Sequence, residues 1–347
     1  MKNKKRVLSL FTAAVLMMTT FSACGTSNTP ATTAPEGTTY TIKLATNSTA
    51  DMTHPQNLAS TYFKKILEER SNGAIKVEVY PNAQLGDART IVEGVQLGTI
   101  EMGDVENGTM SGFVPEAALW DLPYLFSSLD QAHKVLDGEI GQNIQALYLN
   151  IGIRNLAYND GGFRYFTNSV RPVKSVADLA GLKIRVMESN VMIQSINAFG
   201  ASAVPMAFTE LYTALQQGTV DGEENPLDLI YAQNYFEVQK YLSLSEHFYY
   251  PRQYIISEDF YQSLPADLQE IVATAAKDAC TYQREQYAIY LEKMLGALKD
   301  QGFEVDEFDK TEAMAIAETV WPDFYKIIGS GDAAAGEQIV KSIAAMR

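Results

Sequence analysis

The sequence is poor in cysteine, histidine and basic residues. Its 347 residues include two cysteines and three histidines, and 27 lysines and arginines stand against 42 aspartates and glutamates. Two cysteines cannot build a disulfide framework or a cysteine-rich zinc site, and His54, His133 and His247 are too widely spaced for a metal-binding run. A formal net charge of −15 opposes the phosphate attraction on which nucleic-acid binding depends. The composition therefore predicts no metal, no cofactor and no nucleic-acid partner.

Long apolar runs are also missing, except at the N-terminus. Residues 2–6 carry four positive charges, and the mostly apolar stretch 7–22 is shorter than the roughly 20 residues of a membrane-spanning helix. This pattern predicts a signal peptide over residues 1–23 and an exported protein. Because the signal peptide holds four basic residues and no acid, its removal changes the formal charge from −15 to −19. Such an acidic protein is repelled by anionic lipid headgroups.

The end of the signal peptide indicates a lipid anchor. The segment Phe21-Ser22-Ala23-Cys24-Gly25 resembles a bacterial lipoprotein cleavage site, in which the cysteine becomes the lipidated first residue. An ordinary secretory signal with a cysteine nearby is the alternative. Residues 25–39 are rich in Thr, Pro, Ser and Gly, so residues 24–39 are predicted to be a lipid-anchored flexible linker. The other cysteine, Cys280, is then unpaired, and its helical surroundings indicate an inert packed thiol.

From residue 40 the chain alternates strand-like and helix-like patterns, which predicts an α/β architecture with a largely parallel sheet. A second series of alternating patterns begins near residue 153, so two α/β lobes are expected. The predicted strands are 40–45, 74–80, 153–158, 163–167, 182–187, 240–245 and 252–257, and the predicted helices are 55–71, 87–97, 190–199 and 208–217.

A long helical pattern fills residues 265–300, which contain one proline, at 265, and one glycine, at 296. An unbroken helix of this length would span about 54 Å, more than one lobe, and would have to bridge both. The alternative is two helices with a break near 278–281 or at Gly296. The first lobe is expected to comprise 40–161 with about 251–290, and the second 162–250 with about 291–347.

No catalytic motif appears in the sequence, but two arginines lie in apolar strands. Arg185 lies in Leu182–Met187 and Arg164 lies between aromatic residues after Gly161-Gly162. Burying a guanidinium without an anion costs several kcal/mol, on the order of the cost of breaking a buried ion pair. Each arginine therefore pairs either with an internal carboxylate or with the carboxylate of a ligand, which the planar guanidinium can bind in bidentate fashion. Asn225, held before Pro226, is a further candidate, with a plain turn as the alternative.

The chain resembles the solute-binding subunits of TRAP (tripartite ATP-independent periplasmic) transporters, of the dicarboxylate- and sugar-acid-binding type. The resemblance runs from about residue 40 to 330 and is strongest in residues 178–185, 199–201, 205–216 and 220–226, including the Gly-Leu-Lys-Ile-Arg and Glu-Asn-Pro segments. Further matches are residues 80–87, 115–117 and 122–124. The resemblance implies a two-lobed periplasmic-binding-protein-like fold, with a ligand cleft between the lobes and a long helix bridging them.

The resemblance also implies the ligand contacts. Arg185 would form a salt bridge with the ligand carboxylate, Arg164 would be a second anion contact, Phe208 would pack on the ligand's carbon frame, and Asn225 would bond its polar groups. The implied first-lobe contacts are Glu106, Asn107 and Asn47. Glu188 would repel a second acid group but accept hydroxyl hydrogen bonds, which favours a polyhydroxylated monoacid such as a uronate over a dicarboxylate. For His247 and Tyr249, packing is favoured over ligand contact.

The implied function is capture of a small carboxylate by lobe closure and its delivery to the membrane subunits of an ion-coupled TRAP transporter. The protein is then not an enzyme, and its only membrane contact is the lipid on Cys24. A ligand-sensing receptor module that passes its ligand to a signalling protein is the alternative. An exported hydrolase is disfavoured because no nucleophile and base pair is recognisable.

Overall fold

The computed structural model describes residues 39–347, so the predicted signal peptide, Cys24 and nearly all of the linker lie outside the described residues. Nine strands form one sheet in the order β2-β1-β3-β8-β4-β7-β5-β6, and β9 pairs with β8. The strands are β1 (Tyr40–Thr46), β2 (Ile75–Tyr80), β3 (Met102–Glu106), β4 (Ile153–Asn168), β5 (Lys183–Val186), β6 (Ser202–Pro205), β7 (Gly222–Asn225), β8 (Tyr241–Ser257) and β9 (Glu304–Glu307).

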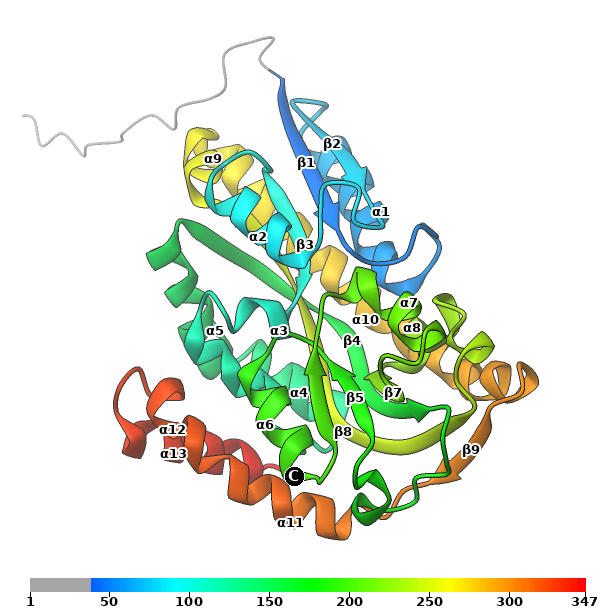
Figure 1. Cartoon of the computed structure of the whole chain (residues 1–347). Coiled ribbons are helices and arrows are strands. Elements are labelled where there is room, and N and C mark those ends of the chain that lie inside the picture. Colours follow the sequence, from blue (N-terminus) through cyan, green and yellow to red (C-terminus); the bar gives the residue numbers. More distant parts are fainter. Residues whose placement is uncertain (1–38) are drawn as a thin grey trace, which may run out of the picture.

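Helices cover this sheet on both sides (Figure 1). Within the described residues, no helix is both long enough and apolar enough to cross a membrane. The α-helices are α1 (Pro55–Arg70), α2 (Ala88–Gln96), α3 (Asn107–Met110), α4 (Leu129–Leu136), α5 (Glu139–Leu147), α6 (Asn190–Ala198), α7 (Leu211–Gln216), α8 (Leu227–Ala232), α9 (Glu258–Ser263), α10 (Ala266–Asp300), α11 (Lys310–Val320), α12 (Pro322–Ile328) and α13 (Ala333–Ala344). The 3₁₀ helices are η1 (Pro115–Asp121), η2 (Tyr148–Ile151), η3 (Val176–Leu179), η4 (Phe208–Glu210) and η5 (Tyr235–Glu237).

Two long antiparallel strands, β4 and β8, join two parallel groups, β1–β3 and β5–β7. The sequence predicted each long strand as two short ones, and this was wrong. Gly161 and Gly162 lie within β4, where the register shifts between Asp160 and Phe163. The strand bends at this irregularity and continues, because glycine accepts the positive φ of 77° found at Gly162.

The pairing directions bring the carboxyl ends of the two parallel groups toward each other. The last residue of β3, Glu106, pairs with Arg252 near the middle of β8. The last residue of β7, Asn225, pairs with Tyr165 in β4. Loops that follow the strands of both groups therefore meet over the middle of the two long strands. Ligands of open α/β sheets bind at such carboxyl ends.

Helix α10 is continuous, so the prediction of an unbroken helix is confirmed. Its 35 residues span about 52 Å at 1.5 Å per residue. It packs against α1 on the side of the first parallel group, against β4, and against α8 on the side of the second (Figure 1). The two-lobed architecture with a bridging helix is thus as expected.

Helices α12 and α13 pack toward elements of the predicted first lobe, whereas α11 packs on α6 and η3 of the predicted second lobe. Trp321 and Phe324 of the α11–α12 region and Ile343 of α13 share one hydrophobic cluster with Trp120 of η1 and Leu136 of α4. The sequence had assigned these two sets to different lobes. They share a cluster because α12 packs on η1 and α13 packs on α12. The proposed lobe boundaries at 161/162 and 290/291 stay a prediction.

Substitution of Gly162 tests the bend in β4. A Cβ at Gly162 would lie well inside van der Waals distance of the Tyr287 hydroxyl, and the φ of 77° is unfavourable for an L side chain. We expect Gly162→Ala to lower the free energy of unfolding by about 1–3 kcal/mol, measured by chemical denaturation. The control is Gly296→Ala in α10, where no atom lies within 4 Å of the added Cβ. Gly296→Ala should raise the free energy of unfolding by about 0.5–1 kcal/mol. Equal effects would contradict this account of the bend.

Candidate ligand-binding site

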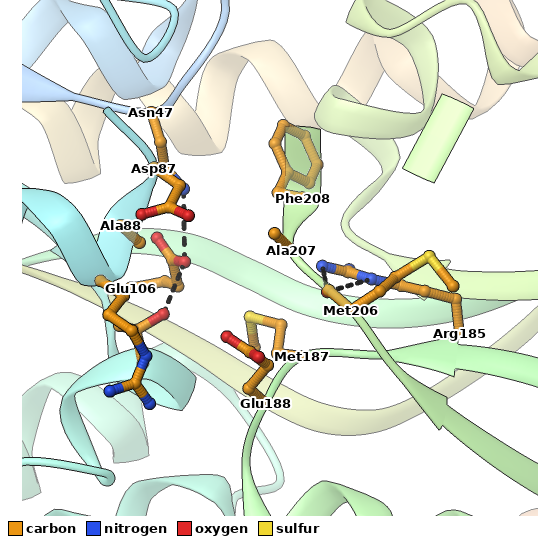
Figure 2. A pocket seen from close by; sticks show the side chains of 12 residues that line it. Asn47, Asp87, Ala88, Glu106, Arg185, Met187, Glu188, Met206, Ala207 and Phe208 are labelled. Carbon is orange, nitrogen blue, oxygen red and sulfur yellow. Dashed lines mark hydrogen bonds between the residues drawn. The ribbon is translucent and has the colours of Figure 1, made fainter. Parts of the chain in front are cut away.

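Two adjoining hollows lie where the carboxyl ends of the strands meet. They enclose about 300 Å³ and about 260 Å³ of space between atoms, counting space open to solvent. Figure 2 shows Asn47 and Glu106 on one side of the first hollow and Arg185 and Phe208 on the other. Residues that line both hollows are Asn47, Glu106, Arg185, Met187 and Phe208.

Arg185 reaches this space from β5 and has no counter-ion within residues 39–347. Its side chain is 1% exposed. Nε and Nη2 donate to the carbonyl oxygen of Met206 at 3.1 and 2.8 Å, and Nη1 has no partner. Within the described residues it makes no ion pair. Burial lowers the pKa of Arg185, because the charged guanidinium has lost hydration.

The other two fully buried arginines in residues 39–347 are paired. Arg164 directs Nε and Nη2 to the carboxylate of Glu224. Arg252 lies 3.1 Å from Asp104 and 3.5 Å from Glu106. The internal salt bridge that the sequence left open for either arginine is thus present at Arg164 and absent at Arg185. Arg185 is the buried arginine that is available to an external carboxylate.

The first-lobe wall is a hydrogen-bonded group of polar side chains. Nδ2 of Asn47 donates to Oε1 of Glu106 at 3.3 Å, and Oγ1 of Thr109 donates to the same oxygen at 3.0 Å. Nη1 of Arg252 lies 3.5 Å from the other carboxylate oxygen of Glu106. These contacts hold acceptor oxygens toward the hollow. The group suits ligand hydroxyls, which can donate to a carboxylate.

The second-lobe wall combines an aromatic ring, an amide and a carboxylate. Phe208 begins η4 and is half-buried, and Asn225 ends β7, where Nδ2 donates to Glu223. Glu188 is exposed at the rim, three residues after Arg185. Together with Asp87 and Glu106, it gives the first hollow three carboxylates (Figure 2).

Two expected contacts do not line either hollow. Asn107 begins α3 and donates Nδ2 to the carbonyl oxygen of Ala117 at 2.9 Å and to Asp121 at 2.8 Å. Its amide nitrogen is therefore held by the η1 segment. Arg164 is fully buried beneath Tyr250, with its guanidinium carbon 4.6 Å from the ring centre. Ligand contact by Asn107 and Arg164 is not supported by their positions.

His247, Tyr249 and Cys280 are packed in the interior. His247 stacks on Phe166 with ring centres 3.9 Å apart, and the hydroxyl of Tyr249 donates to Asp160 at 2.5 Å. The packing that the sequence favoured for these two residues is confirmed. Cys280 is buried, and burial raises the pKa of its thiol, which disfavours the reactive thiolate.

Sequence reasoning missed Arg252 and Tyr250, which line the second hollow from the middle of β8. The signal was available, because Arg252 lies between Tyr250 and Tyr254 in an apolar strand pattern, like Arg164 and Arg185. Its role as the cation of the first-lobe wall depends on the pairing of β8 with β3, which places it opposite Glu106.

The chain has clear relatives among known proteins. A family model described as bacterial extracellular solute-binding protein, family 7, matches residues 46–328. The 2,3-diketo-L-gulonate-binding periplasmic protein YiaO of Escherichia coli is 38% identical over 253 residues, which are 73% of this chain and 77% of that protein. The C4-dicarboxylate-binding periplasmic protein DctP of Rhodobacter capsulatus is 35% identical over 272 residues, which are 77% of this chain and 81% of that protein.

Among solved structures, a TRAP periplasmic solute-binding protein from Polaromonas sp. JS666, bound to D-erythronate, has a TM-score of 0.81 and 33% identity. The match covers 88% of this chain and 98% of that one. Fold and site thus define a two-lobed binding protein with a cleft between α/β lobes. This chain belongs to family 7 of the bacterial extracellular solute-binding proteins, the family of the TRAP periplasmic proteins.

Glu223, next to the site, makes stability depend on pH. Burial raises the pKa of its carboxyl to about 7. Because the pKa of Glu223 is higher in the folded than in the unfolded state, protonated Glu223 adds to the free energy of unfolding at low pH. This contribution is lost as the pH rises from about 4.5 to 7. Between pH 5 and 8 the wild type should lose up to about 3 kcal/mol relative to Glu223→Gln, in which this position cannot ionise. Chemical denaturation at both pH values measures the difference, and parallel pH profiles of the two proteins would contradict it.

Proposed function

We propose that this protein captures a polyhydroxylated monocarboxylate, such as an aldonate or uronate, between its lobes and delivers it to the membrane subunits of a TRAP transporter. The observation that carries the proposal is the buried guanidinium of Arg185, whose Nη1 has no hydrogen-bond partner and which has no carboxylate partner among the described residues. A ligand carboxylate there would supply the missing counter-ion.

The remaining lining groups suit a ligand with one acid group. Asp87, Glu106 and Glu188 would repel a second carboxylate, whereas their oxygens accept hydrogen bonds from hydroxyls. Phe208 would cover the carbon frame of the ligand, and Asn225 would bond its polar groups. The names of the E. coli and Polaromonas relatives, which bind 2,3-diketo-L-gulonate and D-erythronate, agree with this class.

Closure of the two lobes would couple binding to transport. A ligand favours the closed state only through contacts with both lobes. Arg185 and Glu106 provide one such contact from each side. We further propose that the role is binding without turnover, and that export and lipidation at Cys24 keep the protein at the outer face of the cell membrane.

The experiment that tests the proposal is a thermal-shift and calorimetry screen. The panel contains D-erythronate, D-galactonate, D-glucuronate, succinate and malate, since a ligand that binds the folded state raises its apparent stability. Sugar acids should stabilise the wild type more than the dicarboxylates do. If no acid in the panel shifts the melting temperature, the proposal fails.

Arg185→Ala should weaken binding of the tightest acid by about 100-fold or more, because the buried carboxylate loses its cation. Arg185→Lys should recover only part of the affinity, since an ammonium group lacks the planar fork. The control is Arg171→Ala, since Arg171 donates to the carbonyl oxygens of Asp178 and Ala180 outside the cleft. Calorimetry on the three variants measures the effect, and wild-type affinity in Arg185→Ala would refute the assignment.

Glu188→Gln tests the choice between monoacid and dicarboxylate. Removal of this charge should raise the affinity for succinate by about tenfold, because like-charge repulsion is lost, and should leave sugar-acid affinity the same or slightly lower. The ratio of the two affinities from calorimetry measures the selectivity. An unchanged ratio would show that Glu188 does not set it.

A further inference from the structure

Asp228 lies directly behind the ligand cavity and does not line it. It belongs to α8, three residues after Asn225, and its side chain is fully buried. Burial of a carboxylate is costly unless hydrogen bonds replace its hydration. The hydrogen bonds that offset this cost therefore identify the elements that Asp228 connects.

Three side chains contact Asp228, two of them at its carboxylate and the third, His54, near both its backbone oxygen and its carboxylate. Nε2 of Gln56 donates to Oδ2 at 3.2 Å, and the hydroxyl of Tyr287 donates to Oδ1 at 3.1 Å. Nε2 of His54 lies 3.4 Å from the backbone carbonyl oxygen of Asp228 and 3.5 Å from Oδ2. Because the backbone N–H of Gln56 donates to Nδ1 of His54, Nε2 carries the hydrogen that faces Asp228. All four side chains are at most 2% exposed.

These donors come from both sides of the cleft. His54 caps the N-terminus of α1, and Gln56 lies in its first turn, on the side of β1–β3. Asp228 follows β7 on the opposite side. Tyr287 belongs to α10, the helix that extends along both sides (Figure 1). We call this group of four residues the Asp228 junction.

The junction continues into both walls of the cavity. Gln56 lines the second hollow, and its Oε1 accepts a hydrogen bond from Ser48, another lining residue, at 3.1 Å. On the other side, Asn225 and Leu229 flank Asp228 in the chain and line the same hollow. A shift at Asp228 would therefore displace both walls.

The junction is also tied to the bend in β4. The hydroxyl oxygen of Tyr287 lies 2.6 Å from the carbonyl oxygen of Gly161 and 3.1 Å from Oδ1 of Asp228, so its single hydrogen is shared between these two acceptors, with Gly161 the nearer. Gly161 lies at the register shift where β4 passes from pairing with the second half of β8 to pairing with its first half. The same hydroxyl thus links the carboxylate to the segment that connects the two sides.

We propose that Asp228 is a positioning residue for ligand capture, which joins the start of α1 to α8 and holds the Ser48–Gln56 and Asn225 walls in the ligand-binding arrangement. This inference rests on the proposed function for its effect on affinity. The connection between α1 and α8 itself is a property of the ligand-free protein and can be measured without any ligand.

Hydrogen–deuterium exchange on the ligand-free protein tests the connection. Asp228→Ala should speed exchange about tenfold in two segments far apart in sequence, 54–60 and 226–232, because each loses the same partner. The control is Ser243→Ala, which removes a buried hydrogen bond to the carbonyl oxygen of Val173 in the second lobe. It should leave both segments unchanged. Faster exchange in 226–232 alone would overturn the proposal.

Ligand dissociation tests the consequence. With the tightest acid of the panel, Asp228→Ala should weaken affinity about tenfold, mainly through faster dissociation. Asp228→Asn should recover part of it, because its amide oxygen accepts from Tyr287 and its amide nitrogen donates to Gln56 after that side chain turns over. Ser243→Ala should lower thermal stability and leave the dissociation rate unchanged. Wild-type dissociation in Asp228→Ala would overturn the positioning role.

Two outcomes separate this inference from the proposed function. If the wild type binds no acid of the panel, the proposed function fails and the exchange experiment still decides whether Asp228 joins α1 to α8. If Asp228→Ala does not fold, Asp228→Asn takes its place in both experiments, with a smaller change of the same kind expected. No change in exchange in Asp228→Asn would then overturn the proposal.

Discussion

The buried, uncompensated guanidinium of Arg185 is the constraint on which the site depends. Two of its nitrogens share one carbonyl oxygen, that of Met206, and the third has no partner in the part of the chain that the structure describes. A carbonyl dipole offsets only part of the hydration that a full charge loses, so the site is better satisfied with an anion than without one. Arg164 and Arg252 are equally buried, but they have their own carboxylates. This difference is the reason why Arg185, and not Arg164 or Arg252, is the arginine proposed to bind the carboxylate of the ligand.

The geometry of the sheet places Arg185 on one side of a cleft. Because β4 and β8 extend through the whole sheet, the parallel groups on either side point their carboxyl ends at the same place. Glu106 and Asn47 then face Arg185 and Phe208 across the first hollow (Figure 2). Behind that space, the buried contacts of Asp228 connect α1, α8 and α10, so the walls of the cleft are linked at their base.

The protein carries a strong negative charge and is nevertheless proposed to bind an anion. The two statements are compatible because electrostatic interactions in water weaken with distance. Exposed charges farther than about 8 Å apart are largely screened at physiological ionic strength, whereas Arg185 would act at contact. The net charge of −15 therefore bears on solubility and on repulsion from anionic lipid. In the proposed site, the carboxylates of Glu106 and Glu188 would act at short range and would favour hydroxyl donors over a second acid group.

Local patterns in the sequence determined the α/β class, the long helix over 266–300 and the strand on which Arg185 lies, because periodicity is a property of neighbouring residues. The strands β3 and β7, which end at Glu106 and Asn225, were not among the predicted strands. Tertiary structure decided the rest. The merging of short strands into β4 and β8, and the position of Arg252 opposite Glu106, depend on register between distant strands. Whether a buried arginine has an internal ion-pair partner depends on which side chains the fold places next to it. Arg164 pairs with Glu224, whereas Arg185 has no carboxylate partner among the described residues and is therefore available to a ligand.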